Sequence, residues 1–163
     1  MERDSIEPLG LANWFGSVGR LSALAAEGPG TIGSALRHAY HLVQLAPHAL
    51  RTTVAAALNE QAFEDLLDAG VYDIAAQALV GSPAGLALVR QPGSKAIFAE
   101  VRFPDGRGLG NAQGRTIALA ILQAWCRAAL ALDRSSDTAR TVGHTTVIPL
   151  RPRFRSDPAT LGA

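Results

Sequence analysis

The stretch from residue 95 to residue 132 constrains the fold most, because it ends in a long apolar run. This run, Thr116 to Leu132, contains no proline or glycine. Only Gln123 and Arg127, four positions apart, place larger polar side chains along one side of it. A helix that is apolar around most of its circumference must be covered on most sides. The run therefore predicts a buried core helix, with Trp125 inside the core.

The residues before this run predict a β-hairpin. Side chains along the first strand point alternately to two faces. One face carries Ile97, Ala99, Val101 and Phe103, and the other carries Phe98, Glu100 and Arg102. This alternation is typical of a half-buried strand. The turn that follows, residues 103–106, has proline at its second position and Gly106 where a positive φ is needed. We expect a short return strand over residues 107–110, weakened by Gly108 and Gly110.

The chain before the hairpin predicts helices up to a boundary at residues 81–83. Apolar residues recur there at helical spacing. The predicted helices cover residues 8–27, 31–46, 47–58, 61–69 and 72–80. A strand is expected at 86–90, a polar loop at 133–141 and a possible last strand at 145–150. The fold class is therefore α+β: a helical N-terminal part followed by a small antiparallel β-sheet with one buried C-terminal helix.

The chain has 163 residues, which suits one domain with a full core. Its expected parts are a helical region over 1–81, a β-hairpin plus core helix module over 82–150 and a basic flexible tail over 151–163. Cys126 is the only cysteine, so no intrachain disulfide is possible. No apolar run approaches the roughly 20 residues of a membrane span, and no signal peptide is evident. We expect a cytoplasmic protein without a membrane partner; its arginine and alanine bias resembles that of GC-rich bacterial genomes.

Charge divides unevenly between the two halves. Residues 1–83 hold four arginines against nine acidic residues, a net charge of −5, whereas residues 84–163 hold eleven basic residues against five acidic ones, a net charge of +6. Such asymmetry arises where two halves pack together, and also where a basic half meets nucleic acid. The candidate basic contacts are Arg107, Arg115, Arg151, Arg153 and Arg155.

Two glycine clusters are candidates for nucleotide-binding sites. Residues 28–33 match the glycine spacing of a dinucleotide-binding turn, but a helix is predicted where that turn needs a strand, so a helix–helix connector is favoured. In the second cluster, residues 106–114, free amides at the start of the core helix and the adjacent Arg115 could hold an anion. The spacing does not fit a phosphate-loop motif, and a tight hairpin accounts for these glycines without a ligand.

The remaining reactive side chains give no catalytic pattern. His38, His41 and His48 lie within eleven positions, yet they match no zinc-binding spacing, and we expect neither a metal nor a cofactor. Cys126 follows Trp125 in the apolar run, which favours a small buried side chain over a nucleophile. Enzymatic activity stays uncertain and is the less favoured interpretation.

The order of strand, turn, strand and alanine-rich helix in residues 95–132 resembles two families. One is the double-stranded-RNA-binding domain, and the other is the small antitoxin-type hairpin–helix domain, in which a Phe-Pro-Asp turn precedes a helix. The first resemblance implies a basic cluster at the helix start, which is reduced here to Arg115. The second implies a DNA-binding segment, and none is evident. No family is assigned on these residues.

The favoured function is that of a non-enzymatic protein-binding or regulatory protein that acts through a protein–protein surface. The alternative is a nucleic-acid-binding protein that uses the basic C-terminal half. Trp14 and Phe15 are adjacent aromatic residues on an amphipathic predicted helix. Because exposed apolar stripes usually meet a partner, we expect this pair at a subunit or partner contact, most simply in a symmetric homodimer.

Overall fold

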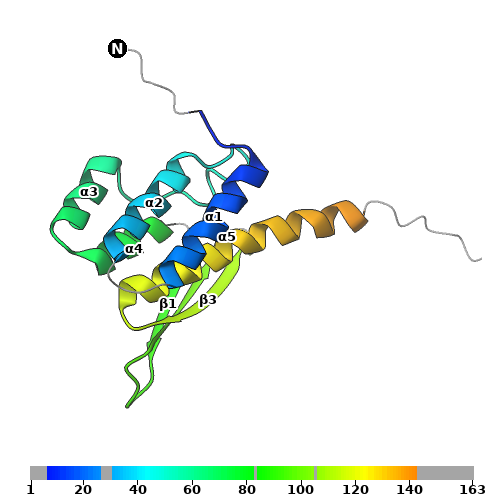
Figure 1. Cartoon of the computed structure of the whole chain (residues 1–163). Coiled ribbons are helices and arrows are strands. Elements are labelled where there is room, and N and C mark those ends of the chain that lie inside the picture. The colour runs from blue at the N-terminus through cyan, green and yellow to red at the C-terminus, as the bar shows by residue number, and fades with distance from the viewer. Residues whose placement is uncertain (1–6, 27–30, 83, 105, 143–163) are drawn as a thin grey trace, which may run out of the picture.

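The computed structural model describes residues 7–26, 31–82, 84–104 and 106–142 (Figure 1). The α+β fold class is confirmed, because helices precede an antiparallel sheet that a buried helix follows. The helices are α1 (Leu11–Ala26), α2 (Ile32–Gln44), α3 (Glu60–Asp68), α4 (Tyr72–Val80) and α5 (Ile117–Val142). The strands are β1 (Gly85–Arg90), β2 (Ile97–Arg102) and β3 (Leu109–Gly114), in the sheet order β1-β2-β3.

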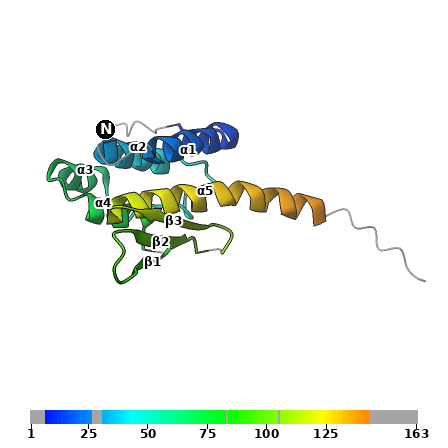
Figure 2. The same ribbon diagram turned by 60° about the horizontal axis from the view of Figure 1, so that its bottom comes forward.

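The elements stack in three layers, with the sheet on one side, α4 and α5 in the middle, and α1 and α2 on the other side (Figure 2). Helix α5 therefore packs against the sheet on one side and against α1 on the other. This position explains why the sequence of α5 is apolar on nearly all sides. Trp125 is fully buried, so the prediction of a core helix is confirmed. Within the described residues, no helix combines the length and hydrophobicity that crossing a membrane requires.

The two larger polar side chains of the core helix connect it to its neighbours. Gln123 donates a hydrogen bond of 3.2 Å from Nε2 to the carbonyl oxygen of Ala25, in the last turn of α1. Arg127 donates a hydrogen bond of 2.5 Å from Nη1 to the carbonyl oxygen of Asn111 on β3. A helix end leaves carbonyl groups without an intrahelical partner, and Gln123 satisfies one of them.

Helix α5 approaches β3 closely because small residues face each other across the contact. A Cβ atom at Gly110 would collide with the carbonyl oxygen of Ala124 and with the amide nitrogen of Ala128. At Gly114, a Cβ atom would lie 2.6 Å from the amide nitrogen of Ala120. Glycine on the strand and alanine on the helix therefore set the separation of the two elements, because any larger side chain would push them apart.

The predicted hairpin turn is confirmed. Gly106 has a φ of +68°, and its amide donates a hydrogen bond of 3.0 Å to the carbonyl oxygen of Phe103. The amide of Phe103 in turn donates to the carbonyl oxygen of Gly108 at 2.9 Å. The return strand is longer than expected, because it runs to Gly114 instead of ending at residue 110. Asp105, in the same turn, lies outside the described residues.

The predicted helix over residues 47–58 is wrong, because this segment forms a series of turns. Contacts with other elements hold its backbone. The amide of Ala57 donates to the carbonyl oxygen of Ala78 at 2.8 Å, and the carbonyl oxygen of Leu58 accepts a 3.0 Å hydrogen bond from the Tyr40 hydroxyl. Tertiary contacts thus outweigh the weak helical preference of this segment.

The predicted loop over residues 133–141 is also wrong, because α5 continues to Val142. The segment contains neither proline nor glycine. Extending an existing helix costs far less than starting one, so polar residues can continue it beyond the core. In Figures 1 and 2 this last part of α5 projects past the other elements. The possible strand at 145–150 and the tail at 151–163 lie outside the described residues.

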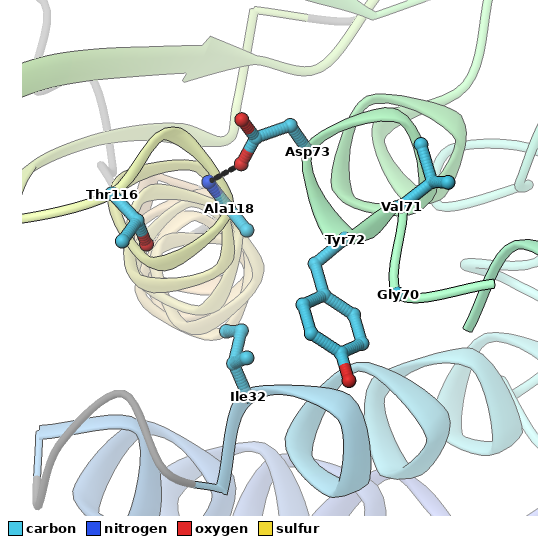
Figure 3. A pocket seen from close by; sticks show the side chains of 7 residues that line it. All are labelled: Ile32, Gly70, Val71, Tyr72, Asp73, Thr116 and Ala118. Atoms are coloured by element: carbon cyan, nitrogen blue, oxygen red, sulfur yellow. Dashed lines mark hydrogen bonds between the residues drawn. The ribbon is translucent and has the colours of Figure 1, made fainter. Parts of the chain in front are cut away.

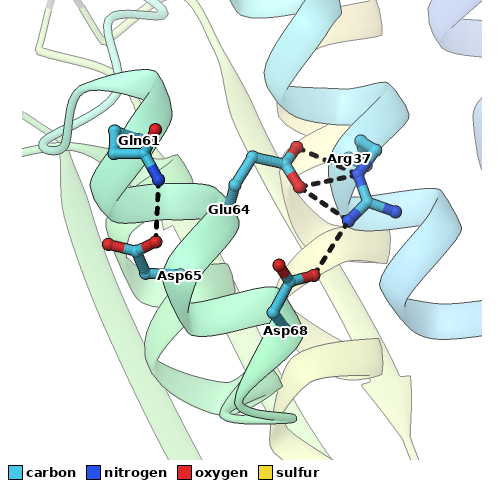
Figure 4. A network of polar contacts seen from close by, with 5 residues as sticks. All are labelled: Arg37, Gln61, Glu64, Asp65 and Asp68. Atoms are coloured by element: carbon cyan, nitrogen blue, oxygen red, sulfur yellow. Dashed lines mark hydrogen bonds and ion pairs between the residues drawn. The ribbon is translucent and has the colours of Figure 1, made fainter.

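An ion pair connects α2 to α3 on the surface (Figure 4). The guanidinium of Arg37 donates from Nε and Nη2 to the carboxylate of Glu64, with the shortest bond at 2.6 Å. Asp68 lies 3.6 Å from the same Nη2 atom. Hydrogen bonding from Arg37 lowers the pKa of Glu64 below its ordinary value of 4.5. The contact joins two helices, which gives it a structural role.

We expect the Arg37–Glu64 contact to stabilise the fold at neutral pH and to lose this effect in acid. The pKa of Glu64 is lower in the folded state, so its contribution is present above the unfolded-state value of about 4.5 and disappears as the pH falls through the folded-state value. Glu64→Gln should therefore lower the urea midpoint more at pH 7 than at pH 3. Asp65→Asn, which removes a more exposed carboxylate charge on the same helix, is the matched control. An equal loss at both pH values would contradict this account.

Candidate functional site

The predicted contact pair, Trp14 and Phe15, lies in the core of its own chain. Trp14 is completely buried, and its indole Nε1 donates a 2.7 Å hydrogen bond to the carbonyl oxygen of Leu42. Its ring meets that of Phe15 edge-on at 5.3 Å and that of Trp125 at 6.5 Å. In this fold the pair joins α1 to α2 and α5 and does not form a surface. The packing therefore does not support the expectation that Trp14 and Phe15 lie at a subunit or partner contact.

The candidate basic residues do not converge in the part of the chain that is described. Arg107 and Arg115 are both exposed, but they flank opposite ends of β3. Six strand residues separate such ends by about 20 Å. Arg151, Arg153 and Arg155 lie outside the described residues. The described candidates therefore form no compact basic patch.

A cavity of about 550 Å³ opens where the start of α5 meets α2 and α4 (Figure 3). Its lining is mostly apolar, with polar groups from Tyr72, Asp73 and Thr116. The carboxylate of Asp73 accepts a 2.9 Å hydrogen bond from the amide of Ala118, and the Thr116 hydroxyl accepts one of 3.2 Å from the amide of Leu119. Two of the polar groups in this cavity thus cap the N-terminus of α5.

The two caps occupy the position at the start of the core helix where an anion site is possible. Two of its first amides already have partners, and Asp73 places a carboxylate beside them. An anion would meet like charge at this position. The arrangement therefore opposes a phosphate site, and it supports the interpretation that the glycines before the helix serve the hairpin. The first glycine cluster lies between α1 and α2, without the preceding strand that a dinucleotide site requires.

The other reactive residues are dispersed. Within the described ranges, no group of three histidine, cysteine, aspartate or glutamate side chains is placed to hold a metal ion. His38, His41 and His48 are all exposed. Burial raises the pKa of the Cys126 thiol to about 12, so this cysteine stays protonated and unreactive at neutral pH.

Strand β1 is the most exposed regular element of the sheet. Five of its six residues are exposed, and only Leu86 is partly covered. Leu88 is 40% exposed and Val89 is 57% exposed, although both are large apolar side chains. The reason is the placement of α5, which packs on β3 and β2, whereas β1 lies beyond its cover. The outer face of β1 is therefore open, and its inner face is covered only in part, at Leu86, which packs against the core.

The sheet register shows which backbone groups of β1 are free to bond. Phe103 is hydrogen-bonded to Gly108, and every second residue before it on β2 (Val101, Ala99 and Ile97) therefore bonds to β3 in the same way. The backbone groups of the residues between them, Phe98 included, then point in the opposite direction, towards β1. Since Phe98 lies opposite Val89, the backbone of Val89 bonds to β2. The groups of its neighbours Leu88 and Arg90 then point to the open edge, as do those of Leu86.

The two edges of the sheet differ in their protection. On β3, the carbonyl oxygen of Asn111 points away from β2 and accepts the hydrogen bond from Arg127, and α5 lies along this strand. On β1, the sequence Gly-Leu-Ala-Leu-Val-Arg contains no proline, no acidic residue and no lysine, and its single charge is Arg90 at the end. Proteins usually block an exposed edge with such residues or with a covering element. Apart from Arg90 at its end, the edge of β1 has no such residue, and no described element covers it.

A shallow apolar groove of about 240 Å³ adjoins this edge, lined by Leu88, Val89, Arg90, Ile97 and Ile117. Together, the edge and the groove make up the candidate site, which we call the β1 edge. The sequence-based candidates omitted it. The available signal was a short apolar strand, residues 85–89, with no charge before Arg90. Comparison of the chain with protein-family models, curated proteins and solved structures finds no match.

Proposed function

We propose that this protein is a non-enzymatic binding protein that takes up an extended strand of a protein partner at the β1 edge. In this mode of recognition, main-chain hydrogen bonds to an open sheet edge provide affinity, and pockets for alternate side chains provide specificity. The observation that carries the proposal is the exposed, apolar and unblocked edge of β1. An edge of this kind is a template for pairing with another chain.

Binding agrees better with the described residues than catalysis does. In the cavity at the start of α5, Asp73 and Thr116 are occupied in capping α5, and the buried Cys126 thiol does not line it. The described candidates thus offer no nucleophile beside a base, which covalent catalysis would require. The β1 edge, in contrast, offers backbone donors and acceptors next to exposed Leu88 and Val89.

Photo-crosslinking in cells that produce the full chain tests the proposal. p-Benzoylphenylalanine replaces Val89 in one variant and Leu109 in a matched control. Both positions carry exposed apolar side chains on the outer face of the sheet, but Leu109 lies on β3, two strands away. Neighbouring strands are about 4.8 Å apart, so a strand added beside β1 stays out of reach of position 109.

We expect a protein adduct at position 89 and none at position 109. Equal adducts at both positions would indicate a partner that covers the outer face, and no adduct at either would indicate an unoccupied edge; both results would contradict strand addition. Nucleic acid that copurifies with the chain and is released by high salt would instead support the alternative function, because phosphate contacts depend strongly on salt.

A further inference from the structure

Building on the proposed function, we infer that the strand added at the β1 edge is β1 of a second copy of this chain. The two strands would pair antiparallel about a two-fold axis at Leu88, joining two three-stranded sheets into one of six strands. The axis stands perpendicular to the sheet, so α5 of both copies lies on the same side. Closed two-fold assemblies of this kind are the commonest symmetric oligomers.

The distribution of charge along β1 suits a second copy. Its only charged residue, Arg90, lies at the C-terminal end of the strand. Antiparallel pairing places the two Arg90 side chains at opposite ends of the new interface, about four residues or roughly 13 Å apart. Between them lie only small or apolar side chains, which match their own copies without opposing like charges. A second copy therefore meets no electrostatic penalty at this edge.

The direction of the backbone groups selects a register centred on one residue. The free donors and acceptors belong to Leu86, Leu88 and Arg90, so these must form the new hydrogen-bonded pairs. With the axis at Leu88, this residue pairs with its own copy and Leu86 pairs with Arg90. The same register places Ala87 opposite Val89 on the outer face. It also brings the two exposed Leu88 side chains together beside the apolar groove.

Cysteine substitution tests this register directly. Residues in a hydrogen-bonded antiparallel pair have Cα atoms about 5.5 Å apart, within the range that a disulfide spans. Leu88→Cys should therefore give a disulfide-linked dimer under mild oxidation. In Ala87→Cys, the matched control, the two residues are diagonal neighbours at roughly 7–8 Å and should bridge much more slowly. The native Cys126 is fully buried and should not interfere.

Sedimentation of the full chain supplies a second readout that needs no disulfide. We expect the wild type to dimerise at micromolar concentration. Leu88→Lys, which places two like charges at the axis, should raise the dissociation constant about tenfold or more. Gln113→Lys introduces the same charge on the exposed face of β3 and should leave the dimer unchanged.

The outcomes separate the inference from the proposed function. A wild type that stays monomeric, or an adduct at position 89 that contains only a different protein, would overturn the self-pairing while leaving strand addition intact. Bridging of Ala87→Cys in preference to Leu88→Cys would overturn the register. Absence of any adduct at position 89 would remove the proposed function itself.

Discussion

Replacing Trp125 by alanine is expected to lower the free energy of unfolding by about 3–5 kcal/mol, the usual cost of truncating a large buried aromatic side chain. Trp125 is completely buried, and its ring lies edge-on to that of Trp14 at 6.5 Å. Because the Trp14 ring belongs to α1, the resulting cavity would lie between α5 and α1. Urea unfolding monitored by circular dichroism measures the loss.

Phe98→Ala provides the matched control for this prediction. Phe98 is also aromatic, but it lies on the outer face of the sheet and is 38% exposed. Its truncation should cost less than about 1 kcal/mol, because little packing is lost at an exposed site. Trp125→Phe should cost less than Trp125→Ala, since phenylalanine fills part of the cavity. Among the described residues, the Nε1 atom of Trp125 has no hydrogen-bond partner that phenylalanine would lose. A loss below about 1 kcal/mol for Trp125→Ala would contradict the three-layer packing.

Gly110→Ala is expected to destabilise the fold by about 3 kcal/mol or more, at or above the upper end of the usual range for overpacking. The new methyl group would meet the backbone of α5 at Ala124 and Ala128, and backbone cannot move aside as a flexible side chain can. The strand and the helix would have to separate along their whole contact. Thermal and urea unfolding of the purified variant measure the effect.

The matched control for Gly110 is Gly85, in β1 of the same sheet. A Cβ atom at Gly85 would lie 3.8 Å from its nearest neighbours, both in Arg102, which is ordinary van der Waals contact. Gly85→Ala should therefore change stability by no more than about 0.5 kcal/mol. If Gly110→Ala were equally mild, the close approach of β3 and α5 would not be a property of the folded protein.

The helical part of this fold could be predicted where the local pattern agrees with the packing. The predicted helix over residues 72–80 matches α4, and the apolar run from Thr116 matches the buried part of α5. Residues 47–58 also carry apolar side chains at helical spacing, yet they form turns. Their backbone bonds to Ala78 and Tyr40 come from distant parts of the chain, which no local pattern reveals.

Strand β3 shows why glycine was misinterpreted in the sequence. Gly108 and Gly110 indicated a weak and short strand, because glycine lowers strand preference. In the structure Gly110 belongs to a longer strand, Gly108 directly precedes that strand, and both let the backbone of α5 come close. The helix residues that match them lie 14 to 20 positions later, Ala124 and Ala128 for Gly110 and Ala128 for Gly108. The match between these glycines and the alanines of α5 can be recognised only when the strand that the helix covers is known.

The candidate site was the least predictable part. Adjacent Trp14 and Phe15 indicated an exposed stripe, but α2 and α5 cover them. Residues 86–90 were predicted as a strand, which β1 confirms within one residue. Whether a strand lies at the centre or the edge of a sheet depends on the order of pairing, and its exposure depends on where the helices lie. Neither property is encoded locally in the residues of β1.

Amide hydrogen exchange of the full chain tests the pairing of β1 with a second copy most directly. The amides of Ala87 and Val89 bond to β2, so they should exchange slowly whether or not a partner is present. The amides of Leu88 and Arg90 face the open edge. We expect them to exchange rapidly at low protein concentration, and also in Leu88→Lys, but slowly in the associated wild type. If these two amides exchange at the rate of an unprotected peptide at every concentration, while Ala87 and Val89 stay protected, the β1 edge takes up no second copy and the account of self-pairing fails.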